Sequence, residues 1–267
     1  MLVMSGLAAC CAGAQSFEVA SVKRCQNGEP PSGGDPDPGR LHLGCVTTSN
    51  LIRLAYLVFP TGQPNAPVSP AVFQAPISGG PAWINSDRYT VDAKSTKPVN
   101  IEMMKGPMMQ SLLNERFALE IHWETKQRDI FELIVARGGP NLQRANAGGC
   151  VVSDRNHPLP TPAPGEAVPV LCGVLRRNVG GGFDAASVTM ADLCQQLSAY
   201  VDREIVDKTG IEGVFDVHVD LNPADIAPDG DDSVVAIAVK KLGLQMRPAK
   251  GSVQLLMIDH VERPTEN

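Results

Sequence analysis

Apolar and polar positions along the chain fall into short stretches that alternate like strands or recur at helical spacing. After an alternating stretch at 17–22, the pattern predicts a strand at 40–45 and a helix at 48–58 that a threonine caps. The pattern also predicts strands at 74–78 and 89–94, an amphipathic helix at 102–116, and two strands at 119–124 and 130–136. We expect these last two strands to form a hairpin across Lys126–Arg128.

The same order of elements restarts in the second half of the chain. A hairpin across Lys250-Gly251 is expected to end it, with strands at 244–248 and 253–261. Before that hairpin, the pattern predicts strands at 182–187, 204–206 and 214–221, and helices at 190–200 and 233–242.

Short sequence echoes accompany the repeated order. Val46-Thr47 followed by Leu51 returns as Val188-Thr189 followed by Leu193, and 86–92 resembles 212–218. A duplicated unit explains this pattern. We therefore predict an α+β fold of two tandem pseudo-repeated β-α-β-β-α-β-β units, with mixed sheets and helices on one face.

This interpretation divides the chain into four segments. A signal-like segment at 1–14 precedes a first unit at 16–140, a Pro/Gly-rich linker at 141–181 and a second unit at 182–267. A Pro-rich insertion at 60–76 lengthens the first unit.

The N-terminus points to export. Its apolar residues end in Ala12-Gly13-Ala14, which suits signal cleavage, although no basic region precedes them. Leu7–Cys10 also resembles a lipobox, which would make Cys10 a lipid-anchored N-terminus. A secreted, periplasmic or envelope location is expected in either case.

Export exposes the cysteines to oxidising conditions. We predict disulfides Cys25–Cys45 and Cys150–Cys172, each closing a loop of about 20 residues and adding about 3 kcal/mol. Cys194 lies at an inward position of a predicted helix and is expected to be a buried thiol. Other pairings among these cysteines stay open.

Composition excludes several classes of partner. The net charge is −6 and aromatic residues make up only 4%, which argues against nucleic acid. No stretch of the sequence approaches the roughly 20 apolar residues of a transmembrane helix.

One candidate for catalysis lies near the C-terminus. In a strand, His260 and Glu262 share a face, so the carboxylate can support the imidazole as a general base, with Asp259 beside them. An ion pair that secures the last strand is the plainer interpretation. No GxSxG motif accompanies these residues.

Three further residues are weak candidates for ligand binding. Lys208 opens a Lys-Thr-Gly triplet seen in penicillin-binding enzymes, but the SxxK that those enzymes need is absent, so a turn explains it. Trp83 can serve as a surface anchor or a core-edge residue. His122 and His218 lie in predicted strands and can approach one another, but no metal-binding spacing occurs, and we expect no metal or other cofactor.

Five motifs together resemble a large uncharacterised family of exported proteins from soil bacteria, a domain of unknown function, over 16–267. The motifs are Phe17–Lys23, Ile77–Tyr89, Leu112–His122, Val206–Gly213 and Ile258–Asn267. The resemblance implies no established activity. Each half also resembles the short N-terminal domain of secretins and TonB-dependent receptors, an analogy of fold alone.

These observations favour a non-enzymatic binding or interaction module of the bacterial envelope, whose partner is an envelope protein or a small ligand. The alternatives are an envelope hydrolase that uses His260 and Glu262, and a secretin- or TonB-type assembly module. The sequence leaves the ligand and the oligomeric state open.

Overall fold

The chain divides into two compact units, which are described separately. Unit 1 comprises Met1–Pro64, Pro81–Glu120 and His260–Asn267, and unit 2 comprises Asn65–Gly80 and Ile121–Asp259. The computed structural model describes residues 15–25, 31–33, 39–64, 77–154, 162–163, 166, 168–221 and 233–265. The signal-like segment with Cys10 and most of the predicted insertion at 60–76 lie outside the described residues.

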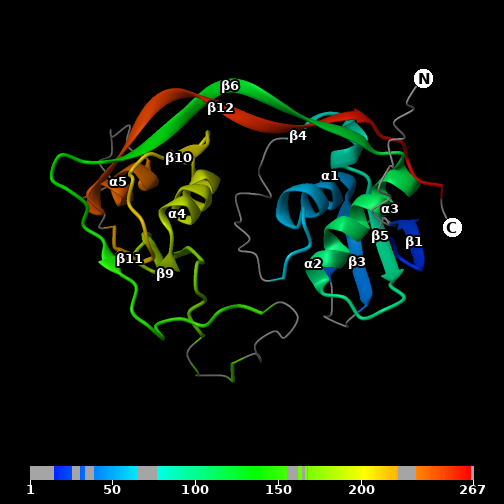
Figure 1. Cartoon of the computed structure of the whole chain (residues 1–267), viewed down its shortest axis with the longest axis horizontal. Helices are drawn as coiled ribbons and strands as arrows, with labels where there is room; N and C mark the ends of the chain where they lie inside the picture. Colours follow the sequence, from blue (N-terminus) through cyan, green and yellow to red (C-terminus); the bar gives the residue numbers. More distant parts are fainter. Residues whose placement is uncertain are drawn as a thin grey trace, which may run out of the picture. The chain divides into compact units, whose positions relative to one another are not determined.

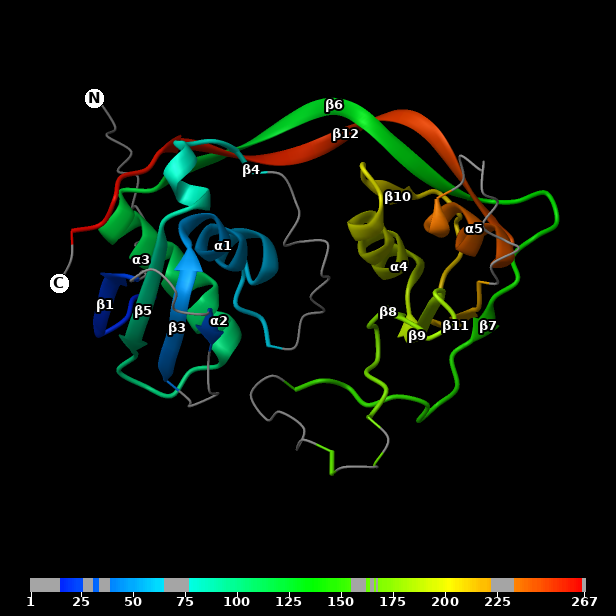
Figure 2. The same cartoon turned by 180° about the vertical axis from the view of Figure 1, so that it is seen from behind.

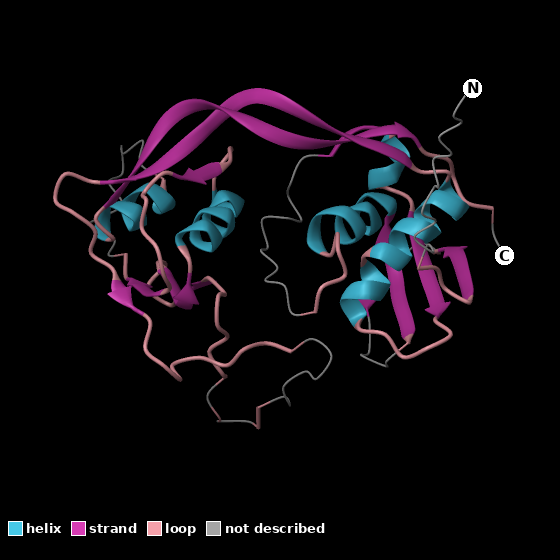
Figure 3. Ribbon diagram, in the orientation of Figure 1, coloured by secondary structure: helices cyan, strands magenta, loops and turns pink. Residues whose placement is uncertain are grey.

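Unit 1 contains an antiparallel sheet with one face covered by helices (Figure 3). Along β5, Tyr89 and Val91 are buried while Arg88 and Asp92 point away from the core, as expected for a half-buried strand. The sheet order is β1-β5-β3-β2, with β1 at Val19–Arg24, β2 at Ser32–Gly33, β3 at Arg40–Thr47 and β5 at Arg88–Lys94.

The helices of unit 1 begin where the sequence places polar caps. The Thr47 side chain accepts a hydrogen bond from the Asn50 N–H, as predicted, and starts α1. The other helical elements are a π-helical turn at Leu54–Val58, a 3-10 turn at Ala82–Asn85, α2 at Ile101–Lys105 and α3 at Pro107–Phe117; α1 itself covers Thr48–Arg53.

The single helix predicted at 102–116 is broken into two. A Cβ on Gly106 would lie 1.9 Å from the Phe59 carbonyl oxygen, so only glycine fits this close approach. Pro107 then occupies the first turn of α3, where its missing N–H costs nothing. Figures 1 and 2 show α1 and α3 on the same face of the sheet, where Phe117 meets Tyr89 edge to face at 5.4 Å.

Unit 2 contains two sheets. One has the order β7-β11-β9-β8, with every neighbouring pair antiparallel. Helices α4 and α5 lie between this sheet and the second one (Figures 1 and 2). The bounds are β7 Gln143–Arg144, β8 Arg176–Arg177, β9 Phe183–Val188, β11 Phe215–Val219, α4 Met190–Leu197, a 3-10 turn at Ser198–Tyr200 and α5 Val234–Lys241.

The second sheet corrects the sequence analysis. Both predicted hairpins are wrong, because β6 (Glu120–Val135) and β12 (Leu244–His260) are each one long strand. The sheet order is β10-β6-β12-β4, with β10 at Ile205–Asp207 and β4 at Ile77–Gly79. Figure 1 shows β6 and β12 side by side as a twisted pair.

Residues predicted to turn the chain instead have partners on the neighbouring long strand. Gln127 donates a hydrogen bond to Ser252 at 2.6 Å, and Lys250 pairs with Asp129 at 2.6 Å. Residue numbers on β12 fall as those on β6 rise, so the strands run antiparallel. A Cβ on Gly251 would lie 2.3 Å from Ile130 Cδ1, so this glycine makes room for a facing side chain and marks no turn.

Each outer strand of this sheet pairs in parallel with the long strand beside it. β4 runs parallel to β12, with Ile77 opposite Leu256, and β10 runs parallel to β6, with Ile205 opposite Phe131. Both pairings connect segments distant in the chain. The core of unit 2 draws on both sheets and both helices, including Leu133, Phe183, Leu193, Val217, Ile237 and Leu244.

Both predicted disulfides are confirmed. Cys25 bonds to Cys45, Cys150 bonds to Cys172, and Cys194 is a free, buried thiol as expected. The short strands β7 and β8 fall within the segment at 141–181 that was predicted as a linker. Within the described ranges, every helix is too short or too polar to cross a bilayer.

The pairing of β6 with β12 can be tested by a cysteine cross-link. We expect a Gln127→Cys/Ser252→Cys variant to form a disulfide, because these side chains already touch. Peptide mapping without reduction should find the two positions joined. In two separate hairpins, residue 127 would lie at a turn, so failure to cross-link would contradict the long-strand pairing. The Gln127→Cys variant alone is the control.

Candidate functional site

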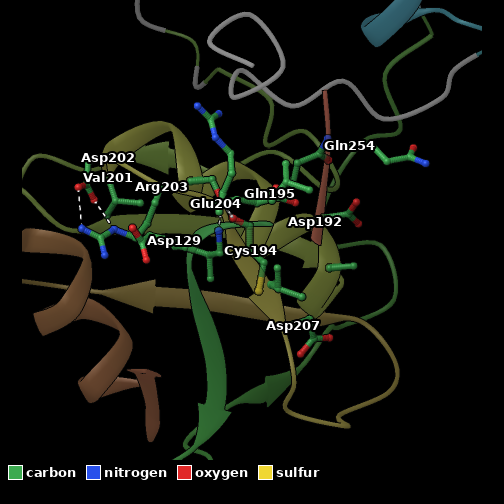
Figure 4. Close-up of a pocket in the computed structure, with 16 residues that line it drawn as sticks. Asp129, Asp192, Cys194, Gln195, Val201, Asp202, Arg203, Glu204, Asp207 and Gln254 are labelled. Atoms are coloured by element: carbon green, nitrogen blue, oxygen red, sulfur yellow. Dashed lines mark hydrogen bonds and ion pairs between the residues drawn. The ribbon is translucent and has the colours of Figure 1, made fainter. Parts of the chain in front are cut away.

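The candidate site is a groove in unit 2 with a volume of about 890 Å³, a size typical of ligand pockets. Helix α4, β10 and the loop between them form its walls, and β6 and β12 contribute Arg128, Asp129, Val253 and Gln254 (Figure 4). The wall residues are Ala191, Asp192, Cys194, Gln195, Ser198 and 201–207.

A serine bridge fixes the two walls relative to each other. The Ser198 hydroxyl donates to the Cys194 carbonyl at 2.8 Å and accepts from the Ile205 N–H at 2.8 Å. The last turn of α4 is thereby tied to the first residue of β10. At the other end of α4, Thr189 caps the helix and also donates to the Asp192 carboxylate.

Most acidic side chains of the groove already have partners. Asp202 forms a two-pronged pair with Arg203, at 2.9 and 2.8 Å, and this pairing lowers the pKa of Asp202. Lys250 likewise lowers the pKa of Asp129. Asp207 accepts from the N–H and hydroxyl of Thr209, which shapes the turn after β10.

Glu204 differs from these acids. In the part of the chain that the structure describes, its carboxylate has no hydrogen-bond or ion-pair partner. Glu204 is one of the residues 201–207 that line the groove (Figure 4). Glu204 is exposed as a whole, but neighbouring atoms exclude part of the water from its carboxylate, and this partial desolvation raises the pKa of Glu204. An ammonium or guanidinium group placed in the groove would compensate this lost hydration.

The thiol in the groove is not a nucleophile. Burial is the main cause that raises the pKa of Cys194 to about 12, and the charge of Asp207 adds to it. A thiol of this kind carries almost no thiolate near neutral pH. The groove therefore offers apolar surface, from residues such as Val201 and Val206, next to an unpaired carboxylate.

None of the residues that the sequence suggested lines this groove. The ion pair between His260 and Glu262 is confirmed at 2.9 Å, and within the described chain the His260 ring bonds to no hydroxyl or thiol. Asp259 pairs with His122 at 2.8 Å, not with His260. His218 pairs with Asp184 in the other sheet, so the structure does not bring the two strand histidines together.

Trp83 and Lys208 both make contacts that stabilise the fold. The guanidinium of Arg263 lies 4.9 Å from the centre of the Trp83 ring and donates to Asp87 at 2.8 Å, which fixes the C-terminal segment onto unit 1. Lys208 begins the turn that Asp207 and Thr209 build, and its N–H donates to the Leu133 carbonyl. Among the described residues, no group of three or more metal-ligating side chains is placed to hold a metal ion.

Sequence reasoning missed Glu204. The one available signal was the charged run Asp202–Glu204, whose last residue opens the strand predicted at 204–206. Such a run is usually a solvated surface, and only the packing of α4 against β10 turns it into a groove wall.

Removing the Glu204 charge should stabilise the protein near neutral pH. The raised pKa means that the folded protein favours the protonated Glu204 carboxyl group. Its contribution to stability is therefore fully present below the unfolded pKa of about 4.3 and is lost as pH rises through the folded pKa. We expect Glu204→Gln to raise the melting temperature at pH 7 relative to wild type, with little difference at pH 3.5. Thermal unfolding followed by circular dichroism measures both. Glu212→Gln, at a glutamate that does not line the groove, is the control, and an equal gain in melting temperature there would contradict the desolvation argument.

Comparison with known proteins gives a family and no activity. A family described as a protein of unknown function (DUF3738) matches residues 66–261, which is most of the chain. No match was found among curated proteins or among solved structures. The chain belongs to this family of proteins of unknown function, DUF3738.

Proposed function

We propose that the protein is an exported binding module whose unit 2 groove takes a cationic ligand. The observation that carries this proposal is the Glu204 carboxylate, which has no partner among the described residues and belongs to the wall of a groove of about 890 Å³. The ligand is a small amine or guanidine, or a basic side chain of an extended peptide, with an apolar neighbour that contacts Val201 and Val206. Two disulfides and the apolar start of the chain support an extracytoplasmic location.

The binding energy follows from charge and desolvation together. A guanidinium against Glu204 forms charge-assisted hydrogen bonds, which contribute about 1.5–3 kcal/mol each where water is excluded and about 0.2–1 kcal/mol at an exposed site. The partly covered Glu204 carboxylate lies between these limits. The other carboxylates of the groove contribute less, because Arg203 and Lys250 already neutralise Asp202 and Asp129. Glu204 is therefore the residue that selects for positive charge.

We also propose that the chain is a tandem pseudo-repeat whose halves exchange strands. Several matching features support this interpretation. The strand order β1-β5-β3-β2 of the unit 1 sheet corresponds to the order β7-β11-β9-β8 of one unit 2 sheet, and Thr47 and Thr189 cap corresponding helices. Cys45 and Ser187, each two residues before its cap, both have positive φ, at 52° and 51°.

The exchange concerns the outer strands of the second sheet. β4 from the first half pairs with β12 from the second, and β10 from the second pairs with β6 from the first. Residues 16–140 would then correspond to the first repeat and 141–267 to the second, because β7 and β8 of the second repeat lie within 141–181. Co-expression of the two halves as separate chains should give a stable complex, whereas halves that fold independently and stay apart would contradict the exchange.

Ligand binding can be measured with a matched pair of peptides. We expect acetyl-Val-Arg-Val-amide to bind wild type in calorimetric titration, and its citrulline analogue, of similar shape but uncharged, to bind at least about tenfold more weakly, a difference of about 1.4 kcal/mol. Glu204→Gln should remove the preference, because it leaves the shape of the groove and removes its charge.

Glu212→Gln is the control and should bind like wild type. Equal binding of both peptides to wild type, or an unchanged preference in Glu204→Gln, would show that the groove does not recognise charge through Glu204.

A further inference from the structure

Three side chains meet on the helix-free face of the unit 1 sheet. Asp92 on β5 lies opposite His42 on β3, and its Oδ1 is 2.7 Å from His42 Nδ1. Ser32 on β2 places its Oγ 3.4 Å from His42 Nε2. The neighbouring residues Leu41 and Leu43 are buried, which holds β3 in the register that turns His42 to the open face.

The His42 imidazole connects Ser32 to Asp92 in the order found in a nucleophilic triad. One ring nitrogen faces a carboxylate and the other faces a hydroxyl, so the neutral ring can donate to Asp92 and accept from Ser32. The 3.4 Å separation is long, as is common for such contacts before a substrate is bound. The three residues come from adjacent strands, so no sequence motif marks them.

Gly44 makes room for this arrangement. It lies opposite Ser32 in the β2–β3 pairing, and a Cβ there would be 2.1 Å from Ser32 Oγ and 3.3 Å from His42 Nε2. Its backbone φ is not in the left-handed region, so the turn geometry does not require glycine. The space beside the hydroxyl is what the missing side chain provides.

The surroundings fix the strand that carries the imidazole. The Cys25–Cys45 disulfide closes the chain segment that contains Ser32 and His42. Cys45 also donates its N–H to Thr90 Oγ1 at 3.3 Å, beside a register shift between Leu43 and Val46. Irregularities of this kind re-aim side chains and are frequent next to active sites.

The other described histidines lack this combination. His218 faces Asp184 at 2.7 Å through Nδ1 and Asp220 at 3.2 Å through Nε2, so both nitrogens meet carboxylates. His122 and His260 pair with Asp259 and Glu262 and have no hydroxyl partner among the described residues. His218 therefore supplies a matched control for a histidine–aspartate pair without a nucleophile.

We propose that Ser32 is the nucleophile and His42 the general base of a hydrolytic site for small carboxylic esters, with Asp92 as a positioning residue. Ser32 Oγ attacks the ester carbonyl carbon while its proton passes to His42 Nε2. The bond to the alkoxy oxygen breaks, and the leaving alcohol takes that proton. Water, deprotonated by His42, then attacks the acyl-enzyme, and the acid leaves as Ser32 regains its proton.

The openness of the site defines the substrate class. The side chains of His42 and Asp92 are 51% and 57% exposed, so water screens their interaction and no deep pocket selects a long acyl chain. Short, activated acyl esters are therefore the expected substrates, with slow turnover. This activity lies in unit 1 and does not depend on the groove of unit 2.

Two measurements on the oxidised, full-length protein test the proposal. Wild type should hydrolyse p-nitrophenyl acetate and should be labelled on Ser32 by a fluorophosphonate, which forms an oxygen–phosphorus bond as fluoride leaves. Ser32→Ala should abolish the label, and His42→Ala should lower the hydrolysis rate by about 100-fold, the usual contribution of a general base. Asp92→Asn should lower kcat and leave KM unchanged, because Asp92 does not touch the ester.

Two further variants separate the site from general effects of folding. Gly44→Ala keeps all three residues but displaces the serine hydroxyl, and should lose both label and hydrolysis while retaining the wild-type circular dichroism spectrum. His218→Ala should behave like wild type. Hydrolysis that persists in Ser32→Ala, a label on another residue, or wild-type rates no higher than those of Ser32→Ala would overturn the proposal.

Discussion

The antiparallel contact between β6 and β12 is the interaction on which unit 2 depends. Its two outer strands, β10 and β4, have no other neighbour in the described chain and attach through registers set by Phe131 and Leu256. Both long strands also supply core residues, such as Leu133 and Leu244, beneath α4 and α5. Because β6 and β12 are more than 100 residues apart in the chain, the sheet assembles only when most of the chain is in place, which disfavours independent folding of its parts.

The shape of the groove depends on the pairing of β6 with β12. β10 is held by β6 on one side and by the Ser198 bridge to α4 on the other, so the loop at 201–204 cannot move away from either wall. The polar atoms of that loop are mostly committed to each other, as in the Asp202–Arg203 pair. The Glu204 carboxylate is left with partly lost hydration and, within the described ranges, no compensating partner. Because the other charged side chains of the loop already have partners, the Glu204 carboxylate is the group available to bind a ligand.

Local structure was predictable because its causes are local. Caps at Thr47, Thr189 and Ser233 and the alternation along β5 are readable from a few residues, and both disulfides follow from short loops. The hairpin across Lys250-Gly251 was predicted wrongly because a lysine–glycine step between alternating stretches is a turn signal only if the strands on either side pair with each other. Gly251 instead accommodates Ile130, a contact between distant segments that no local pattern encodes.

The candidate sites were hidden for the same reason. His260 lies two residues before Glu262 and was found easily in the sequence, and its Nε2 lies 2.9 Å from the Glu262 carboxylate. The contact between Ser32, His42 and Asp92 needs the registers of two strand pairs at once.

The second ring nitrogen decides between an ion pair and a catalytic base. At His218 both nitrogens meet carboxylates, and Asp184 foremost raises the pKa, so the ring favours the protonated form with two donors and no lone pair to offer. At His42 the second nitrogen meets a hydroxyl, which can donate a hydrogen bond to the lone pair of that nitrogen. Both histidines face aspartates at the same 2.7 Å. The difference in chemistry therefore lies in which residue the sheet places on the far side of the ring.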